Sequence, residues 1–126
     1  MQHNELSLLL AGIAGAYNIC FAFFHLLFWR IFRWPRTILP SGTVNVAITQ
    51  TLNIMLTYCF VLYGGWLIWA ALSEVRSPPL LVAGSGFWLL RTALQPALFG
   101  MQAGVSVMIT VIFVIGVALH LAAAVA

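Results

Sequence analysis

Long apolar runs separated by short polar stretches dominate this sequence. About 20 residues are needed for a helix to cross the hydrocarbon core of a bilayer. The runs lie at about residues 6–31, 44–72, 80–95 and 102–124. The third run is the shortest, and Pro96 ends or kinks it, because proline removes a helical hydrogen bond. The pattern predicts an all-α protein, a four-transmembrane-helix antiparallel bundle in which residues 1–126 form a single transmembrane domain.

Small and polar residues recur within these runs at helical spacing. Steps of four and three place such residues on one face of a helix, and small residues there let a neighbouring helix approach closely. In the first run the stripe is Ala11, Gly15, Asn18, Ala22, His25 and Trp29; in the second it is Gln50, Asn53, Thr57 and Gly64; in the third it is Gly84, Trp88, Arg91 and Gln95. We therefore expect these faces to point into the bundle and the Leu- and Phe-rich faces to point toward lipid.

Composition indicates a membrane protein rather than a soluble one. The chain of 126 residues is 63% hydrophobic and only 6% charged, whereas a soluble domain has about 25% charged residues. Its five basic residues are all arginines, and they do not gather on a soluble face, so the net charge of +3 gives no reason to expect a nucleic-acid partner. The expected partner is the lipid bilayer.

The distribution of arginines predicts an orientation. Arg30, Arg33 and Arg36 fall in the first connection, whereas Arg76 in the second is balanced by Glu74. Arginines in short loops stay on the cytoplasmic side of a membrane. With four spans, both termini would then lie outside the cytoplasm, which for a bacterial inner membrane means in the periplasm.

This orientation brings polar residues from separate helices to one depth in the cytoplasmic half. We expect them to form a ligand-binding pocket, because polar atoms within a membrane must find one another, water or a ligand. The residues are His25, Gln50, Asn53, Arg91 and Gln95, with Trp29 and Trp88 as walls. Arg91 would bind the negative end of a lipid or another anionic amphiphile. Alternatively, Arg91 extends to the inner headgroups.

Cofactor and metal chemistry find little support in the sequence. Cys20 and Cys59 lack the spacing of a redox or metal motif. His120 is expected at the opposite face of the membrane from His25, whereas a shared haem needs both axial ligands at one level. His25 also fits a hydrogen-bonding role between helices, as do the amides. We therefore expect no metal, no cofactor and no catalytic residue.

Three segments together carry a resemblance that covers nearly the whole chain. They are Phe24-His25-Leu-Leu-Phe28-Trp29-Arg-Ile-Phe32-Arg-Trp34, the series Asn45, Gln50, Asn53, and Phe87-Trp88-Leu-Leu-Arg91 with Gln95. In these the chain resembles a family of small uncharacterised four-helix bacterial integral membrane proteins. The resemblance implies the architecture and no mechanism.

The function expected from these patterns is binding rather than catalysis. The chain would bind a lipid-like or amphipathic ligand through its polar pocket, or a larger membrane partner. The alternative is a small transporter or channel. It would act as a homo-oligomer, because a single four-helix bundle has too small a cross-section to enclose a conduction path easily.

Overall fold

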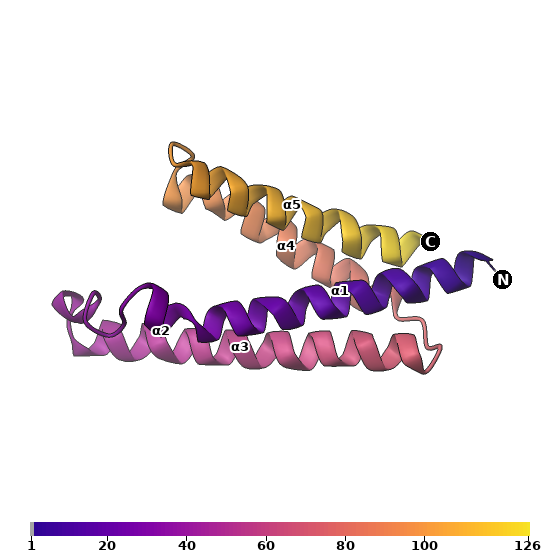
Figure 1. The fold of residues 1–126 in the computed structure, drawn as a ribbon, viewed down its shortest axis with the longest axis horizontal. Helices are drawn as coiled ribbons and strands as arrows, with labels where there is room; N and C mark the ends of the chain where they lie inside the picture. The colour runs from indigo at the N-terminus through magenta and orange to yellow at the C-terminus, as the bar shows by residue number, and fades with distance from the viewer. Residues whose placement is uncertain (1) are drawn as a thin grey trace. The chain divides into compact units, whose positions relative to one another are not determined.

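The structure, a computed structural model, describes residues 2–126 and confirms that this part of the chain is all-helical (Figure 1). The α-helices are α1 (Gln2–Leu26), α2 (Phe28–Ile31), α3 (Thr43–Leu72), α4 (Pro78–Phe99) and α5 (Gly104–Val125), and a short 3-10 helix, η1, covers Leu39–Ser41. Three of them, α1, α3 and α5, have the length and apolar composition of membrane-crossing helices. Many of their large apolar side chains are exposed, as helices surrounded by lipid require.

Helix α4 differs from the other three long helices in composition. It has 22 residues and begins with Pro78 and Pro79, a position where proline has no helical hydrogen bond to lose. It is not among the helices apolar enough to cross a membrane, because Arg91, Gln95 and its prolines lower its mean hydropathy. It also runs on past Pro96 to Phe99 instead of ending at residue 95. Ser106 bonds the Gln95 side chain and the Gly100 carbonyl, one on each side of this last turn.

The first apolar run is divided where a single helix over 6–31 was expected. Helix α1 ends at Leu26, and α2 begins at Phe28. The N–H of Leu27 is shared between the carbonyls of Phe23, at 3.2 Å, and Phe24, at 3.1 Å. Sharing between the fourth and third preceding carbonyls is common at helix ends. The two later runs differ less from expectation: α3 covers Thr43–Leu72 against the expected 44–72, and α5 covers Gly104–Val125 against 102–124.

The chain divides into two compact units. The central unit is Gly15–Trp66; the terminal unit combines the N-terminal residues up to Ala14 with Leu67–Ala126. The single transmembrane domain expected for residues 1–126 stays a prediction.

In the central unit, α1 and α3 pack closely through glycine. A Cβ atom added to Gly64 would lie 2.7 Å from the carbonyl oxygen of Gly15 and 3.0 Å from Cγ1 of Ile19. Phe21 and Phe60 meet beside this crossing, with ring centroids 5.9 Å apart. The predicted stripes are the buried faces here: Gly15, Asn18 and Ala22 are buried on α1, and Asn53, Thr57 and Gly64 on α3.

In the terminal unit, α4 and α5 form a hairpin (Figure 1). Its contact faces are buried and carry Leu81, Gly84, Ser85, Trp88 and Gln95 on α4, and Ser106, Phe113, Gly116, His120 and Ala123 on α5. The hydroxyl of Ser85 donates to the carbonyl of Val117 at 3.2 Å. On α1, the Ser7 hydroxyl donates to the carbonyl of Ala123 at 2.7 Å. Side-chain hydroxyls therefore tie neighbouring helices of this unit together.

Candidate functional site

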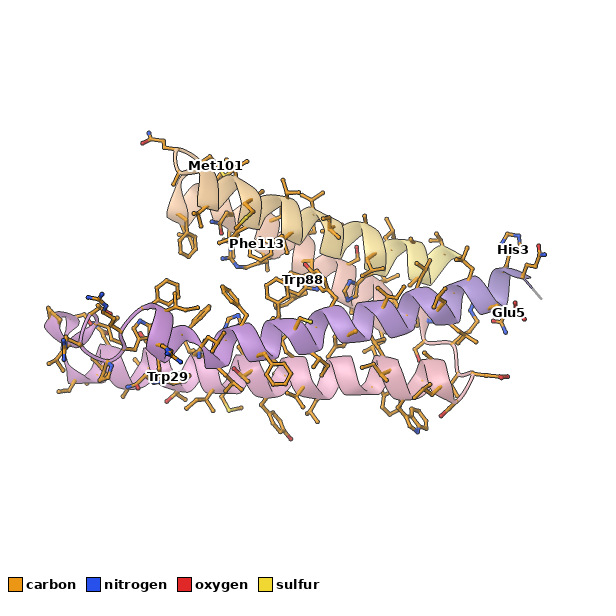
Figure 2. The ribbon with its side chains drawn as sticks, in the orientation of Figure 1. His3, Glu5, Trp29, Trp88, Met101 and Phe113 are labelled. Carbon is orange, nitrogen blue, oxygen red and sulfur yellow. The ribbon has the colours of Figure 1, made fainter. Side chains whose placement is uncertain are left out.

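Arg91 lies among aromatic rings on the α4–α5 hairpin. Its guanidinium carbon is 4.4 Å from the ring centroid of Phe113 on α5 and 5.1 Å from that of Phe99 at the end of α4. Phe113 also stacks on Trp88, with centroids 5.7 Å apart and an interplanar angle of 26° (Figure 2). Trp88 is buried. A cation held over ring faces in this way is stabilised by the negative potential of each π-system.

Two of the residues in this region, Arg91 and Gln95, each have a buried polar atom without a hydrogen-bond partner within residues 2–126. These atoms are Nη1 of Arg91, a donor, and Oε1 of Gln95, an acceptor. The two residues are four positions apart on α4, so they share a helix face. The carboxylates of the chain belong to Glu5 and Glu74, both outside α4. One face of α4 thus carries an unpartnered donor, which belongs to the Arg91 cation, and an unpartnered acceptor on Gln95, and the helix has no carboxylate.

Ser106 fixes the end of the hairpin that carries this group. Its hydroxyl accepts a hydrogen bond from Nε2 of Gln95 at 2.9 Å and donates to the carbonyl of Gly100 at 2.5 Å. Gly100 has a φ of 70°, a conformation that favours glycine, and ends α4. At the same tip the Thr110 hydroxyl contacts the sulfur of Met101 at 3.5 Å (Figure 2). These bonds tie the last turn of α4 to the first turn of α5.

In the central unit, His25 and Asn53 form a two-bond contact between α1 and α3. Asn53 Oδ1 lies 2.7 Å from His25 Nδ1, and Asn53 Nδ2 donates to the His25 carbonyl at 2.9 Å. The first bond places the proton of a neutral imidazole on Nδ1. The imidazole ring is surrounded by phenyl rings, with centroids 4.4 Å from Phe28 and 5.4 Å from Phe60. The contact therefore fixes both the helix register and the orientation of the ring.

Trp29 and Gln50 form a second contact one turn closer to the α2–α3 connection. The indole Nε1 of Trp29 donates to Gln50 Oε1 at 2.8 Å (Figure 2). Gln50 Nε2 lies 3.5 Å from the carbonyl of Val46. The indole ring also meets Trp34 edge to face, with centroids 5.9 Å apart. Both polar residues of this pair are thus engaged within the central unit.

The predicted site residues fall into two groups. His25, Trp29, Gln50 and Asn53 contact one another pairwise in the central unit, whereas Trp88, Arg91 and Gln95 belong to the terminal unit. The residues of the first group bond across one pair of helices, and those of the second group share one face of α4, as their spacing predicted. That the two groups form one pocket stays a prediction.

Sequence reasoning missed the residues that contact Arg91 and Gln95. Phe99 and Phe113 supply the ring faces, and Ser106 bonds the Gln95 amide. A signal was available for two of them: Ser106, Phe113 and His120 recur every seven residues and mark the buried face of α5. His120 is fully buried, and its Nδ1 lies 2.7 Å from the carbonyl of Gly116 on its own helix.

Metal-ligating side chains do not cluster in the described part of the chain. Within residues 2–126, no group of three His, Cys, Asp or Glu side chains is close enough to hold a metal ion. Cys20 and Cys59 are both exposed free thiols.

Comparison of the chain with protein-family models, with curated proteins and with solved structures finds no match. The family resemblance seen in the sequence stays a prediction.

Proposed function

We propose that this chain is a non-enzymatic integral membrane protein whose Arg91 binds the negatively charged end of a lipid-like or amphipathic molecule. The observation that carries the proposal is the pair of buried polar atoms on α4, Arg91 Nη1 and Gln95 Oε1, neither of which has a hydrogen-bond partner in residues 2–126. Buried polar groups are normally hydrogen-bonded, so such a pair needs an explanation. A bound ligand supplies one.

The charge of Arg91 requires compensation. An uncompensated buried charge is strongly destabilising, and the rings of Phe99 and Phe113 offset only part of that cost, about 0.5–2 kcal/mol for each cation–π contact. No carboxylate of the chain lies on α4. A carboxylate or phosphate group matches the guanidinium, because it accepts two parallel N–H bonds from the planar fork.

Gln95 restricts the chemical groups that the ligand can carry. Its Nε2 is already bonded to Ser106, so its buried Oε1 is the atom it offers, and this atom accepts hydrogen bonds only. An anionic oxygen placed there would be repelled. The ligand that fits both residues carries an anionic group for Arg91 and a hydroxyl or amide N–H for Gln95. An apolar tail would lie against ring faces such as that of Phe113.

The membrane arrangement belongs to the same proposal. Helix α4 would be a fourth span: its 22 residues extend about 33 Å at 1.5 Å per residue, which matches a hydrocarbon core of about 30 Å. Arg30, Arg33 and Arg36 favour a cytoplasmic position for the α1–α3 connection. Both termini would then be periplasmic, in a bacterial inner membrane.

Native mass spectrometry of the full chain, released from mild detergent, tests the proposal. Wild type should retain a lipid-like mass that Arg91→Leu loses by about tenfold or more, because hydrogen bonds to charged groups contribute about 1.5–3 kcal/mol. Arg76→Leu is the matched control, since Arg76 is an exposed arginine in the α3–α4 connection. Arg91→Lys should retain an intermediate amount, because lysine keeps the charge and loses the fork.

Equal retention in wild type and Arg91→Leu would overturn the proposal, provided that circular dichroism shows the same helix content for both. Equal losses in Arg91→Leu and Arg76→Leu would also overturn it, because they would show a general effect of charge. The retained mass itself identifies the ligand class.

A further inference from the structure

The turn that joins α2 to α3, which we call the basic turn (Phe32–Gly42), concentrates positive charge. Arg33 and Arg36 lie within it, and both are exposed. Between Glu5 and Glu74 the sequence contains no acidic residue, so the central unit carries basic charge without any carboxylate of its own. A group of this kind attracts an external anion.

The basic turn is held together by its own hydrogen bonds. The hydroxyl of Thr37 donates to the carbonyl of Phe32 at 2.6 Å. The carbonyl of Pro35 accepts from the N–H groups of Ile38, at 3.0 Å, and Leu39, at 2.9 Å. Backbone positions on both sides of Arg36 are therefore defined, which lowers the entropic cost of presenting its side chain to a ligand.

Trp34 attaches the basic turn to the preceding helix. Its indole ring lies edge to face against Phe28, with centroids 5.7 Å apart, and contacts Phe32 at 6.0 Å. Beside it, the surface is hollowed by about 330 Å³, and the hollow is lined by Arg33, Trp34, Pro35 and Arg36. The hollow is open and shallow rather than enclosed. Two guanidinium-bearing residues and an aromatic ring thus share one concave surface.

The position of the hollow along the chain indicates what surrounds it. In the sequence, the hollow lies between α1 and α3, and both of these helices are long and apolar enough to cross a membrane. The hollow therefore falls at the membrane surface, where a membrane-crossing helix emerges from the hydrocarbon core. Tryptophan is enriched at this level, and basic clusters beside spans recognise anionic lipid headgroups. Phosphate diesters are the anions present there at high density.

We infer that the hollow of the basic turn binds the phosphate of an anionic phospholipid such as phosphatidylglycerol. Arg33 and Arg36 bind the phosphate oxygens, and Trp34 and Pro35 lie against the glycerol segment. A choline headgroup would bring a further positive charge close to the two arginines, so the site discriminates against phosphatidylcholine. This inference concerns a different site from Arg91 and does not depend on the function proposed above.

Electron spin resonance of the full chain in phosphatidylcholine vesicles tests the inference. The vesicles carry a trace of spin-labelled phosphatidylglycerol or spin-labelled phosphatidylcholine, and the measured quantity is the ratio of their association constants with the protein. Wild type should prefer phosphatidylglycerol. In Arg33→Gln/Arg36→Gln the preference should fall by about fivefold for each arginine removed.

The matched control is Arg30→Gln/Arg76→Gln, which removes the same charge from two exposed arginines outside the hollow. This control variant should keep most of the preference for phosphatidylglycerol, and Arg91→Leu should keep all of it. The outcome for the basic turn is therefore independent of the outcome for Arg91. Equal losses in the two double variants would overturn the inference. Displacement of the labelled lipid by soluble glycerol 3-phosphate would also overturn it, because the site would then take a free phosphate rather than a membrane lipid.

Discussion

Asn53 holds both the imidazole and the backbone of His25: its Oδ1 lies 2.7 Å from Nδ1, and its Nδ2 lies 2.9 Å from the carbonyl oxygen. A single buried amide thereby joins α1 to α3 in the central unit. The His25 carbonyl lies at the end of α1, where backbone acceptors have no partner within the helix. Asn53 therefore caps a helix end and orients a ring at the same time.

Replacing Asn53 by alanine should destabilise the protein by about 1 kcal/mol, because hydrogen bonds between membrane helices contribute about 0.6 kcal/mol each. The measurement is the unfolding free energy in detergent micelles titrated with dodecyl sulfate. Thr51→Ala, an exposed position on the same helix, should change it little. If Asn53→Ala lowers the unfolding free energy no more than Thr51→Ala does, the two hydrogen bonds contribute nothing to stability.

Gly64→Ala should weaken the crossing of α1 and α3. The new methyl group would lie 2.7 Å from the Gly15 carbonyl oxygen, so the helices must separate, at a cost of about 1–3 kcal/mol. The neighbouring residue offers a matched control: nothing lies within 4 Å of a Cβ added to Gly65. Gly65→Ala should be neutral or slightly stabilising, because alanine is the better helix former. Equal effects of the two substitutions on the same unfolding titration would contradict the close approach.

Gln95→Glu should suppress ligand binding by giving Arg91 a carboxylate of its own. Glutamate would stand four residues from Arg91 on the same helix face, where opposite charges interact. We expect retention of the lipid-like mass to fall about tenfold, as in Arg91→Leu, because hydrogen bonds to a charged group are worth about 1.5–3 kcal/mol. Thermal stability in detergent should stay level or fall, because the substitution also removes the hydrogen bond that Gln95 Nε2 donates to Ser106. Unchanged retention of the ligand in Gln95→Glu would argue against Arg91 as the anion-binding group.

Reporter fusions to the two ends of the chain test whether α4 crosses the membrane. Four crossings place both termini on the same side, whereas crossings by α1, α3 and α5 alone place them on opposite sides. We expect alkaline phosphatase to be active at both ends, which indicates the periplasm, and a fluorescent protein at either end to remain dark. Termini on opposite sides would remove α4 from the set of spans.

Helical periodicity accounts for what the sequence predicted well. The stripe that links Asn18 to His25 lies on the face of α1 that is buried or half-buried, and the one through Asn53 and Thr57 is buried on α3. Spacing alone predicts such faces, because 3.6 residues per turn determine which side chains point the same way. The pairing of His25 with Asn53 then follows from two polar faces meeting within one helix pair.

Other features had no comparable signal. Leucine and phenylalanine continue through Leu27, so nothing in the apolar pattern marks the division between α1 and α2. The extension of α4 beyond Pro96 depends on the bonds of Ser106 to Gln95 and Gly100, which the one-dimensional pattern does not contain. The seven-residue spacing of Ser106, Phe113 and His120 marks the buried face of α5, but it does not show which of its side chains contacts Arg91.

The composition around Arg91 has a consequence for how its site responds to acidity. A guanidinium keeps its proton throughout the physiological range, and α4 carries no carboxylate or imidazole whose titration could switch it. Neither acid nor mild base would therefore alter the charge that this helix offers. A loss of occupancy as the pH falls below about 5 would report protonation of the bound molecule, because a carboxyl group titrates at about pH 4 and a phosphate diester stays ionised there. A simple pH titration of retention would therefore distinguish a carboxylate ligand from a phosphate diester.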